Sequence, residues 1–365
     1  MENWDWVRNR EIEQRVIAAV AAELREAETP GAAIALLRNG EIVLEAGVGY
    51  ADLQQHCPLP SNARFYIYSI TKPLLATVAM NLVEAGRLEL DVSLEPLFTQ
   101  IGYATESPVT LRQLLSHTGG IPGYGDGVAY IEDLLTHPRQ AWTTKKFLQV
   151  AQAQGQLFPP GQGWAYSNIG YLLLRLILTQ ETGLAMPEYL AEWIFRPLGL
   201  QHPLVAETLE QVQALTPGYS QLFTGDDLQN VAPFYHPGWV SHGVVVSTAR
   251  DLGKIMDALF ANRLLAPEHL RQMLEPLHVF DFEHPQIGKI GYGLGLCVGL
   301  DSPYGIVAGH NGGGPGYVTG AFHLSDVQGQ PMTAIALVNR DRYDIDLGVR
   351  VIFKIIHTLA ICNEI

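Results

Sequence analysis

The hydrophobic positions along this chain first follow a helical period and then a strand period. From Arg10 to Glu28 the apolar residues recur with helical spacing, and two strand-like runs, Ala32 to Leu36 and Glu41 to Gly47, come next. Arg38-Asn39-Gly40 joins the two runs, and Asn-Gly is a strong signal for a short hairpin. The chain is therefore predicted to begin with a helix and a β-hairpin.

The middle of the chain, from about Ser61 to Ala261, combines helical spacing with Pro and Gly turns. A long irregular loop is expected from about Pro217 to Gly243, and loops of that length in compact domains are more often functional than not. The helices predicted here lie near residues 69–85, 110–116, 143–154, 168–181, 186–196 and 248–261.

The C-terminal part returns to strand-like patterns. A helix is predicted near 267–275, and a last helix runs from Asp344 to Ile361. The strands predicted between them are Tyr292–Leu300, Gly305–Gly309, Tyr317–Leu324 and Met332–Asn339.

These elements predict an α/β (α+β) fold. In the simplest assembly, the N-terminal hairpin and the C-terminal strands form one antiparallel sheet that the terminal helices cover. We expect residues 1–61 plus 262–365 to form this α/β sheet domain, and residues 62–261 to form an inserted, mainly helical domain. An active site is expected between the two.

Composition excludes several classes of partner. The net charge of −14 argues against nucleic acid and anionic membranes, because a phosphate backbone would be repelled. Cys57, Cys297 and Cys362 form no CxxC pair, so neither a disulfide framework nor a zinc site is indicated. The stretch Met1 to Trp6 has no apolar signal-peptide core, and no apolar run is long enough to span a bilayer. We expect a cytoplasmic protein, and the sequence does not indicate its oligomeric state.

One serine and one lysine form a candidate nucleophile. Among the six lysines only Lys72 follows a serine, Ser69, by three positions, at a predicted helix start. Side chains three apart share a helix face, so the amine can reach the hydroxyl and activate it. Taken alone, the spacing also fits a helix-capping Ser and a surface Lys. Pro73 suits only the first turn and predicts that this turn is tightened.

Tyr166-Ser167-Asn168 precedes the apolar helix that begins at Ile169 and could complete such a site. A nearby ammonium can lower the pKa of a phenol, so that a phenolate at Tyr166 would accept the serine proton. Asn168 offers donors and an acceptor to Lys72 and to a substrate carbonyl. The alternative is a packed turn tyrosine with Asn168 as a helix cap.

The third candidate is the run from His310 to Tyr317, which contains four glycines between two predicted strands. Glycines without side chains allow backbone N–H groups to approach a ligand closely, as an oxyanion hole requires. The alternatives are a flexible hairpin loop and a structural histidine.

The ordered set Ser-x-x-Lys, Tyr-x-Asn and His-x-Gly resembles the serine β-lactamase-like and penicillin-binding-protein-like superfamily. The class C branch, with its esterases, D-aminopeptidases and D-alanyl-D-alanine carboxypeptidases, is the most similar. Leu114 to Ile121 and Ser247 to Leu252 also match, so the resemblance covers roughly residues 12 to 360.

The resemblance implies an acyl-enzyme cycle without a metal or organic cofactor. Ser69 would attack a carbonyl, and Lys72 and Tyr166 would share the proton transfers. Asn168 would orient Lys72 and the substrate. The substrate-binding residues would also include His310, Gly312 and Gly313, with the backbone N–H groups of Ser69 and Gly313 as the oxyanion hole.

The third motif departs from that of antibiotic-resistance members, which usually carry Lys-Thr-Gly where this chain has His310-Asn311-Gly312. Histidine is largely uncharged at neutral pH and holds a substrate carboxylate less well than lysine. We therefore expect a serine hydrolase of a small ester, amide or short peptide, with an esterase favoured. The alternatives are a class C-type β-lactamase, a D-alanyl-D-alanine carboxypeptidase and a catalytically silent binding protein. The pocket walls are expected from the 121–137 and 217–243 loops.

Overall fold

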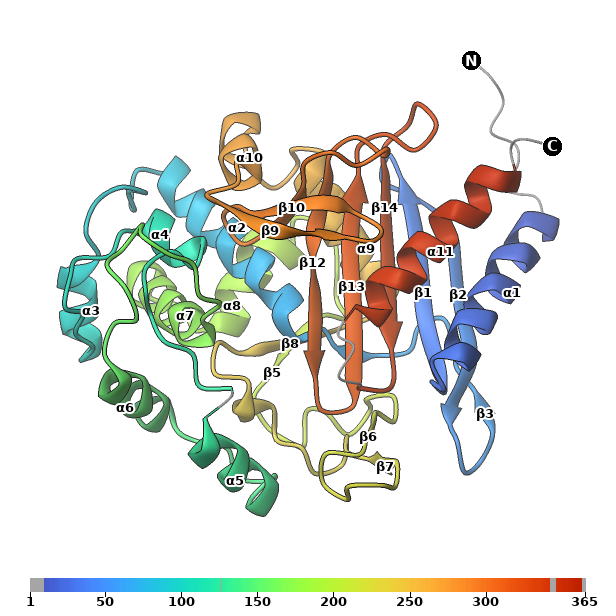
Figure 1. The fold of residues 1–365 in the computed structure, drawn as a ribbon, viewed down its shortest axis with the longest axis horizontal. Coiled ribbons are helices and arrows are strands. Elements are labelled where there is room, and N and C mark those ends of the chain that lie inside the picture. Colours follow the sequence, from blue (N-terminus) through green and yellow to red (C-terminus); the bar gives the residue numbers. More distant parts are fainter. Residues whose placement is uncertain (1–9, 126, 342–345, 363–365) are drawn as a thin grey trace.

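One antiparallel sheet spans the protein and joins both ends of the chain. The computed structural model describes residues 10–125, 127–341 and 346–362. Among them, nine strands are ordered β3-β2-β1-β14-β13-β12-β11-β10-β9. The N-terminal strand β1 pairs with the C-terminal strand β14, with Ile34 opposite Ala336. The predicted α/β fold, with the hairpin and the C-terminal strands in one sheet, is confirmed (Figure 1).

The strands of this sheet are β1 (Gly31–Arg38), β2 (Glu41–Asp52), β3 (Cys57–Pro58), β9 (His278–His284), β10 (Gly288–Tyr292), β11 (Cys297–Gly299), β12 (Val307–Gly314), β13 (Tyr317–Leu324) and β14 (Met332–Val338). Smaller sheets contain β4 (Phe65–Tyr66), β5 (Leu204–Ala206) and β8 (Val244–Ser247), and β6 (Tyr219–Ser220) with β7 (Gln229–Asn230). The helices are α1 (Arg10–Glu26), α2 (Thr71–Glu84), α3 (Glu95–Ile101), α4 (Leu111–Leu115), α5 (Val128–Thr136), α6 (Thr144–Gln154), α7 (Asn168–Thr182), α8 (Met186–Leu190), α9 (Ala249–Phe260), α10 (Pro267–Leu274) and α11 (Leu347–Cys362).

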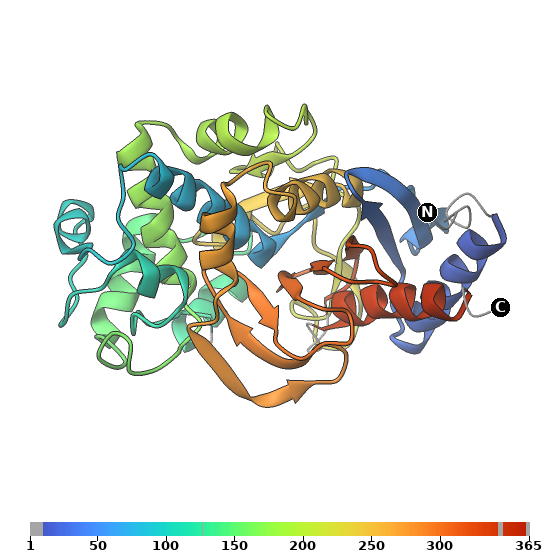
Figure 2. The same cartoon turned by 90° about the horizontal axis from the view of Figure 1, so that it is seen from above.

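Helices cover both faces of the sheet. The terminal helices α1 and α11 pack on one face, and α9 packs on the other (Figure 2). The sequence of strand β1 is an unbroken apolar run because both faces of the strand are buried. Ile34 and Leu36 enter the core under α1 and α11, whereas Ala35 and Leu37 enter the core on the opposite face. Alternate residues of one strand thus serve two cores.

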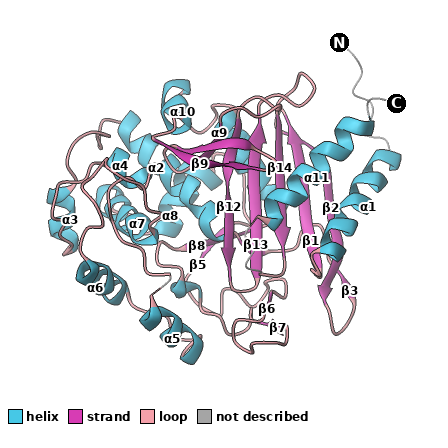
Figure 3. Cartoon of the chain, viewed as in Figure 1, coloured by secondary structure: helices cyan, strands magenta, loops and turns pink. Residues whose placement is uncertain are grey.

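Most of the remaining helices gather beside the sheet, as Figure 3 shows for α2, α3, α4, α6, α7 and α8. Helices α2 and α7 pack together and share the larger hydrophobic core with the sheet face that α9 covers. The division at residues 61/62 and 261/262 stays a prediction. Helix α9, which precedes the second boundary, packs on strands β1 and β14.

Several predicted boundaries were wrong. The apolar run Tyr292–Leu300 is not one strand: β10 ends at Tyr292, a turn through Gly293 and Gly295 follows, and β11 begins at Cys297. Gly295 has φ +79°. Leu294 and Leu296 are fully buried in that turn, so hydrophobicity gave no sign of it. Strand β9 and helices α3 and α5 were not predicted.

Three expectations involve residues outside the described ranges. They concern Asp344 at the start of the last helix, the stretch Met1 to Trp6, and residue 126 within the 121–137 loop. The described residues of that loop include helix α5. Within the predicted 217–243 loop lie the short pair β6–β7 and a single 3₁₀ turn. No helix of the described residues is long and apolar enough to cross a membrane.

Candidate active site

Ser69 lies in a 3₁₀ turn, Tyr68–Ile70, that leads directly into α2. The alternative in which Ser69 caps the helix is wrong, because Ile70 occupies the N-cap and no side chain caps the helix there. The tightened turn expected from Pro73 is present. Pro73 itself is the third residue of α2, where a missing N–H leaves no intrahelical hydrogen bond unmade.

The residue before the serine has an unusual backbone. Tyr68 has φ +45°, a left-handed conformation that costs a non-glycine residue about 1–3 kcal/mol. Its hydroxyl donates a 2.6 Å hydrogen bond to the carbonyl of Pro315, and its ring lies against Gly314, where a Cβ would come within 2.5 Å. These contacts fix the turn that carries Ser69 against the end of strand β12.

Lys72 is completely buried and faces three polar groups. Its Nζ lies 3.1 Å from Ser69 Oγ and 2.8 Å from Asn168 Oδ1. The third group is His242, whose Nε2 lies 3.4 Å away. The structure therefore joins Ser69, Lys72 and Asn168, as the sequence predicts, and adds a histidine that the sequence reasoning missed.

Burial sets the charge of this lysine. Desolvation lowers the pKa of Lys72 well below its ordinary value, because the ammonium form loses its hydration. Its side-chain hydrogen-bond partners among the described residues include no carboxylate. A larger fraction of neutral amine follows, and a neutral amine can accept a proton.

Tyr166 presents its ring face to the lysine. Nζ of Lys72 lies 4.7 Å from the ring centroid. Burial raises the pKa of the Tyr166 hydroxyl, and an interaction with the Ser69 side chain opposes that rise. The expected lowering by a neighbouring ammonium is not found, because desolvation outweighs the other effects. Tyr166 is thus a protonated phenol at neutral pH, suited to donating or relaying a proton.

Asn168 is the first residue of α7 and does not cap the helix. The cap is Ser167, whose Oγ accepts a 2.9 Å hydrogen bond from the amide of Gly170. The side chain of Asn168 is therefore free to hold Lys72. Ser241 donates a hydrogen bond to the backbone carbonyl of Asn168, which further fixes this helix start.

His310, Gly312 and Gly313 lie inside strand β12, not in a loop after it. They pair with β13, with His310 opposite Ala321 and Gly313 opposite Val318. A Cβ at Gly312 would lie 2.4 Å from the carbonyl oxygen of Ile67 and 3.2 Å from the amide nitrogen of Ser69. The glycine lets the strand touch the backbone that carries the nucleophile. Gly313 is exposed beside it.

His310 is 2% exposed, and both of its ring nitrogens contact other protein groups. Nε2 lies 3.1 Å from the hydroxyl of Tyr292, and Nδ1 lies against the carbonyl of Asn311. Burial first, and the charge of Lys72 second, lower the pKa of His310 to about 3. This imidazole is therefore uncharged at neutral pH.

His117 is a second site histidine that the sequence reasoning did not single out. It is 3% exposed, its Nδ1 accepts a 3.1 Å hydrogen bond from the Ser167 amide, and its ring lies 4.4 Å from that of Tyr166. It belongs to the stretch Leu114 to Ile121 that carried part of the family resemblance. Its contacts hold the Tyr166–Asn168 segment in place.

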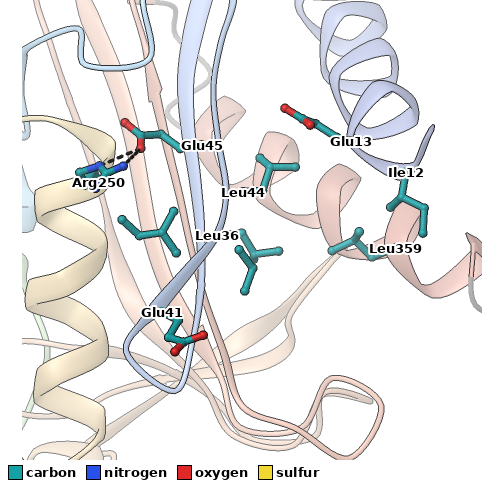
Figure 4. Close-up of a pocket in the computed structure, with 10 residues that line it drawn as sticks. Ile12, Glu13, Leu36, Glu41, Leu44, Glu45, Arg250 and Leu359 are labelled. Atoms are coloured by element: carbon teal, nitrogen blue, oxygen red, sulfur yellow. Dashed lines mark hydrogen bonds and ion pairs between the residues drawn. The ribbon is translucent and has the colours of Figure 1, made fainter. Parts of the chain in front are cut away.

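A pocket elsewhere in the protein is lined by other residues than those around Ser69. A cavity of about 550 Å³ lies between β2, α1, α9 and α11 (Figure 4). Leu36 and Leu44 contribute apolar side chains, and Glu45 forms a 2.6 Å ion pair with Arg250. None of its lining residues belongs to the cluster around Ser69. Its lining residues include no serine or lysine.

Comparisons with known proteins find chains of similar sequence and fold. Penicillin-binding protein 4* of Bacillus subtilis (strain 168) is 26% identical to this chain over 322 residues. The match covers 83% of this chain and 66% of that protein, so the chain spans slightly under two thirds of the length of this relative. The D-stereospecific amidohydrolase from Streptomyces sp. has a TM-score of 0.76 at 26% identity, covering 92% of this chain and 98% of that one. The D-amino acid amidase from Ochrobactrum anthropi SV3, complexed with L-phenylalanine amide, has a TM-score of 0.78 at 25% identity, covering 97% and 99%.

A sequence model of the family described as Beta-lactamase matches residues 15–350, which include every residue of the site described above. The chain therefore belongs to the Beta-lactamase family.

Proposed function

We propose that this protein is a serine hydrolase that forms an acyl-enzyme at Ser69 on a small ester or amide substrate. The observation that carries the proposal is the position of Lys72. Its amine is fully buried and lies 3.1 Å from Ser69 Oγ, with no carboxylate among its side-chain hydrogen-bond partners in the described chain. A lysine in this environment serves as a base and not as a surface charge.

The geometry supports the following proposed cycle. Lys72 removes the proton of Ser69 as Oγ attacks the carbonyl carbon, and the substrate C–O or C–N bond then breaks. Tyr166, a protonated phenol beside Lys72 and Ser69, donates a proton to the leaving group. It regains a proton through Lys72. Water then attacks the acyl-Ser69 ester and releases the acid, which restores the hydroxyl.

The backbone at Ser69 and Gly313 is the proposed oxyanion hole. Strand β12 lies against the Ser69 turn at Gly312, which sets the neighbouring Gly313 beside the nucleophile. Two N–H groups aimed at one point would stabilise the negative oxygen of the tetrahedral intermediate. Asn168 holds Lys72 and is the proposed contact for a substrate carbonyl.

The uncharged His310 favours substrates without a free carboxylate. Because its imidazole is buried and neutral, it supplies no cation to bind an anionic group as a lysine would. Activated short-chain esters are therefore the first class expected. Amides without a free carboxylate satisfy the same requirement, and the names of the two solved relatives make D-amino acid amides the second class.

β-Lactams and peptides ending in D-alanine carry a carboxylate, so we place them last. The experiment compares turnover of a nitrophenyl ester, a D-amino acid amide and a chromogenic cephalosporin, with Ser69→Ala as the control. We expect ester turnover to be fastest and to be lost in Ser69→Ala. Faster turnover of the cephalosporin would contradict this order.

A catalytically silent protein on the same fold is the alternative of another class. A fluorophosphonate probe tests it directly, since only an activated serine reacts. We expect Ser69→Ala to abolish labelling while thermal unfolding stays unchanged. Absence of labelling and of turnover in the unmodified protein would favour the binding role.

A further inference from the structure

His242 contacts the catalytic lysine and has no role in the cycle above. It lies on the segment just before strand β8 and is 2% exposed. Strand β8 pairs with β4, a few residues before Ser69, and the amide of Val245 donates a hydrogen bond to the side chain of Thr71. The backbone around His242 is thus tied to both sides of the nucleophile turn.

The number of hydrogen bonds that a neutral lysine can make indicates what the contact with His242 does. A neutral amine has two N–H donors and one lone pair, and three groups surround Nζ of Lys72. Asn168 Oδ1 can only accept, at 2.8 Å. If His242 Nε2 also accepts, at 3.4 Å, both N–H groups are used. The lone pair then points at the remaining neighbour, the hydroxyl of Ser69.

The surroundings of His242 favour the acceptor form at Nε2. The titratable groups that face it are Lys72 on α2, Arg175 on α7 and His310 on β12. Burial first, and the charges of protonated Lys72 and of Arg175 second, lower the pKa of His242, so its ring is neutral and has a single N–H. Nδ1 makes no hydrogen bond of standard geometry among the described residues, and the backbone of Tyr68 is the polar group that favours a proton on the ring. We therefore assign the N–H to Nδ1 and the lone pair to Nε2, the tautomer in which the ring can accept a hydrogen bond from Lys72.

We propose that His242 is a positioning residue whose Nε2 accepts a hydrogen bond from Lys72 and directs the lone pair of that amine at Ser69 Oγ. The inference rests on the proposed function, because it assigns a role within the same acylation step. His242 does not exchange a proton with the substrate. It acts by fixing the orientation of Lys72.

Two substitutions at His242 distinguish the contribution of Nε2 from that of Nδ1. In His242→Gln the side-chain amide reaches the place of Nε2, so an acceptor for Lys72 remains. In His242→Asn the shorter amide reaches only the place of Nδ1, so the acceptor is lost. His323→Asn is the matched control, because His323 is a partly buried histidine bonded to Thr333 at 3.0 Å on the sheet.

The measurement is the rate of fluorophosphonate labelling at Ser69 as a function of pH. We expect His242→Asn to label about tenfold to a hundredfold more slowly, the size of effect that a misplaced catalytic group produces. His242→Gln should stay within about threefold of the unmodified protein, and His323→Asn should be unchanged. The acid limb of the pH profile of labelling should move to lower pH in His242→Asn. An acceptor stabilises the ammonium form of Lys72 more than its amine form, so losing the acceptor lowers the pKa of Lys72.

A merely structural role would give a different result. His242→Asn and His242→Gln would then be slowed alike, without a shift of the acid limb, and the proposal would be wrong. Unchanged labelling of His242→Asn would also overturn it. If His242→Asn unfolds at lower temperature, His242→Ala with added imidazole replaces it: restored labelling supports the proposal, and failure of imidazole to restore it counts against it.

The two proposals fail in distinguishable ways. If the unmodified protein shows no labelling that depends on Ser69, the proposed function fails and this inference fails with it. If labelling of Ser69 is normal and His242→Asn behaves as the unmodified protein does, only the role of His242 is lost.

Discussion

Asn168 Oδ1 accepts a 2.8 Å hydrogen bond from Nζ of Lys72, across 96 positions of sequence. It is the shortest polar contact of the buried amine, and it ties the start of α7 to the start of α2. The charge of the group at position 168 should therefore control the pKa of Lys72.

Asn168→Asp tests this control. A carboxylate beside Lys72 would stabilise the ammonium and raise the pKa of the lysine, so a higher pH is needed to form the neutral base. We expect the acid limb of kcat/KM for an ester to move up by about one to three pH units. A kcat/KM profile that keeps its acid limb would show that Lys72 is not the group that must lose a proton.

Tyr166→Phe should remove proton transfer without disturbing the packing of Lys72. The ring that lies 4.7 Å from Nζ is kept and only the hydroxyl is lost. We expect kcat to fall about a hundredfold to ten-thousandfold, with the temperature of unfolding unchanged. Tyr103→Phe is the matched control, because Tyr103 is a buried tyrosine outside the site and its loss of a hydroxyl should leave kcat as it was. Equal turnover by the two variants would remove Tyr166 from the mechanism.

Gly312→Ala should damage the site through a single methyl group. That Cβ would lie 2.4 Å from the carbonyl oxygen of Ile67 and 3.2 Å from the amide nitrogen of Ser69, so β12 or the nucleophile turn must move. We expect kcat/KM to fall about a hundredfold. Gly253→Ala is the matched control: its Cβ would lie 2.2 Å from Cδ1 of Leu37, outside the site, so kcat/KM of the folded protein should not change. If Gly312→Ala keeps full activity, the close approach does not position Ser69.

His310 should make the protein less stable in acid. Its pKa is lowered by burial to about 3 in the folded protein, against an ordinary value near 6.5. Between these values the unfolded chain binds the proton more tightly, so the free energy of unfolding decreases as pH falls from 6.5 towards 3. His310→Gln should lose less stability than the unmodified protein between pH 7 and pH 5, measured by urea unfolding. Equal losses would show that His310 does not contribute to acid sensitivity.

The sequence by itself determined four residues of the candidate site and the plan of the sheet. Ser69, Lys72, Tyr166 and Asn168 could be selected because their motifs follow one another in a fixed order, and side-chain spacing on a helix explains why Ser69 and Lys72 meet. The hairpin and the C-terminal strands could be predicted from their apolar runs and from Asn39-Gly40, since these signals are local.

Only the tertiary structure decided the pKa shifts of the site residues and which histidines lie beside them. The pKa of Tyr166 is raised and not lowered, because burial is a property of the packed core that no motif records. His242 reaches Lys72 across 170 positions, from a segment whose sequence predicts only an irregular loop. Such contacts depend on how α2, α7 and β8 are brought together, and local periodicity carries no information about pairs so distant in the chain.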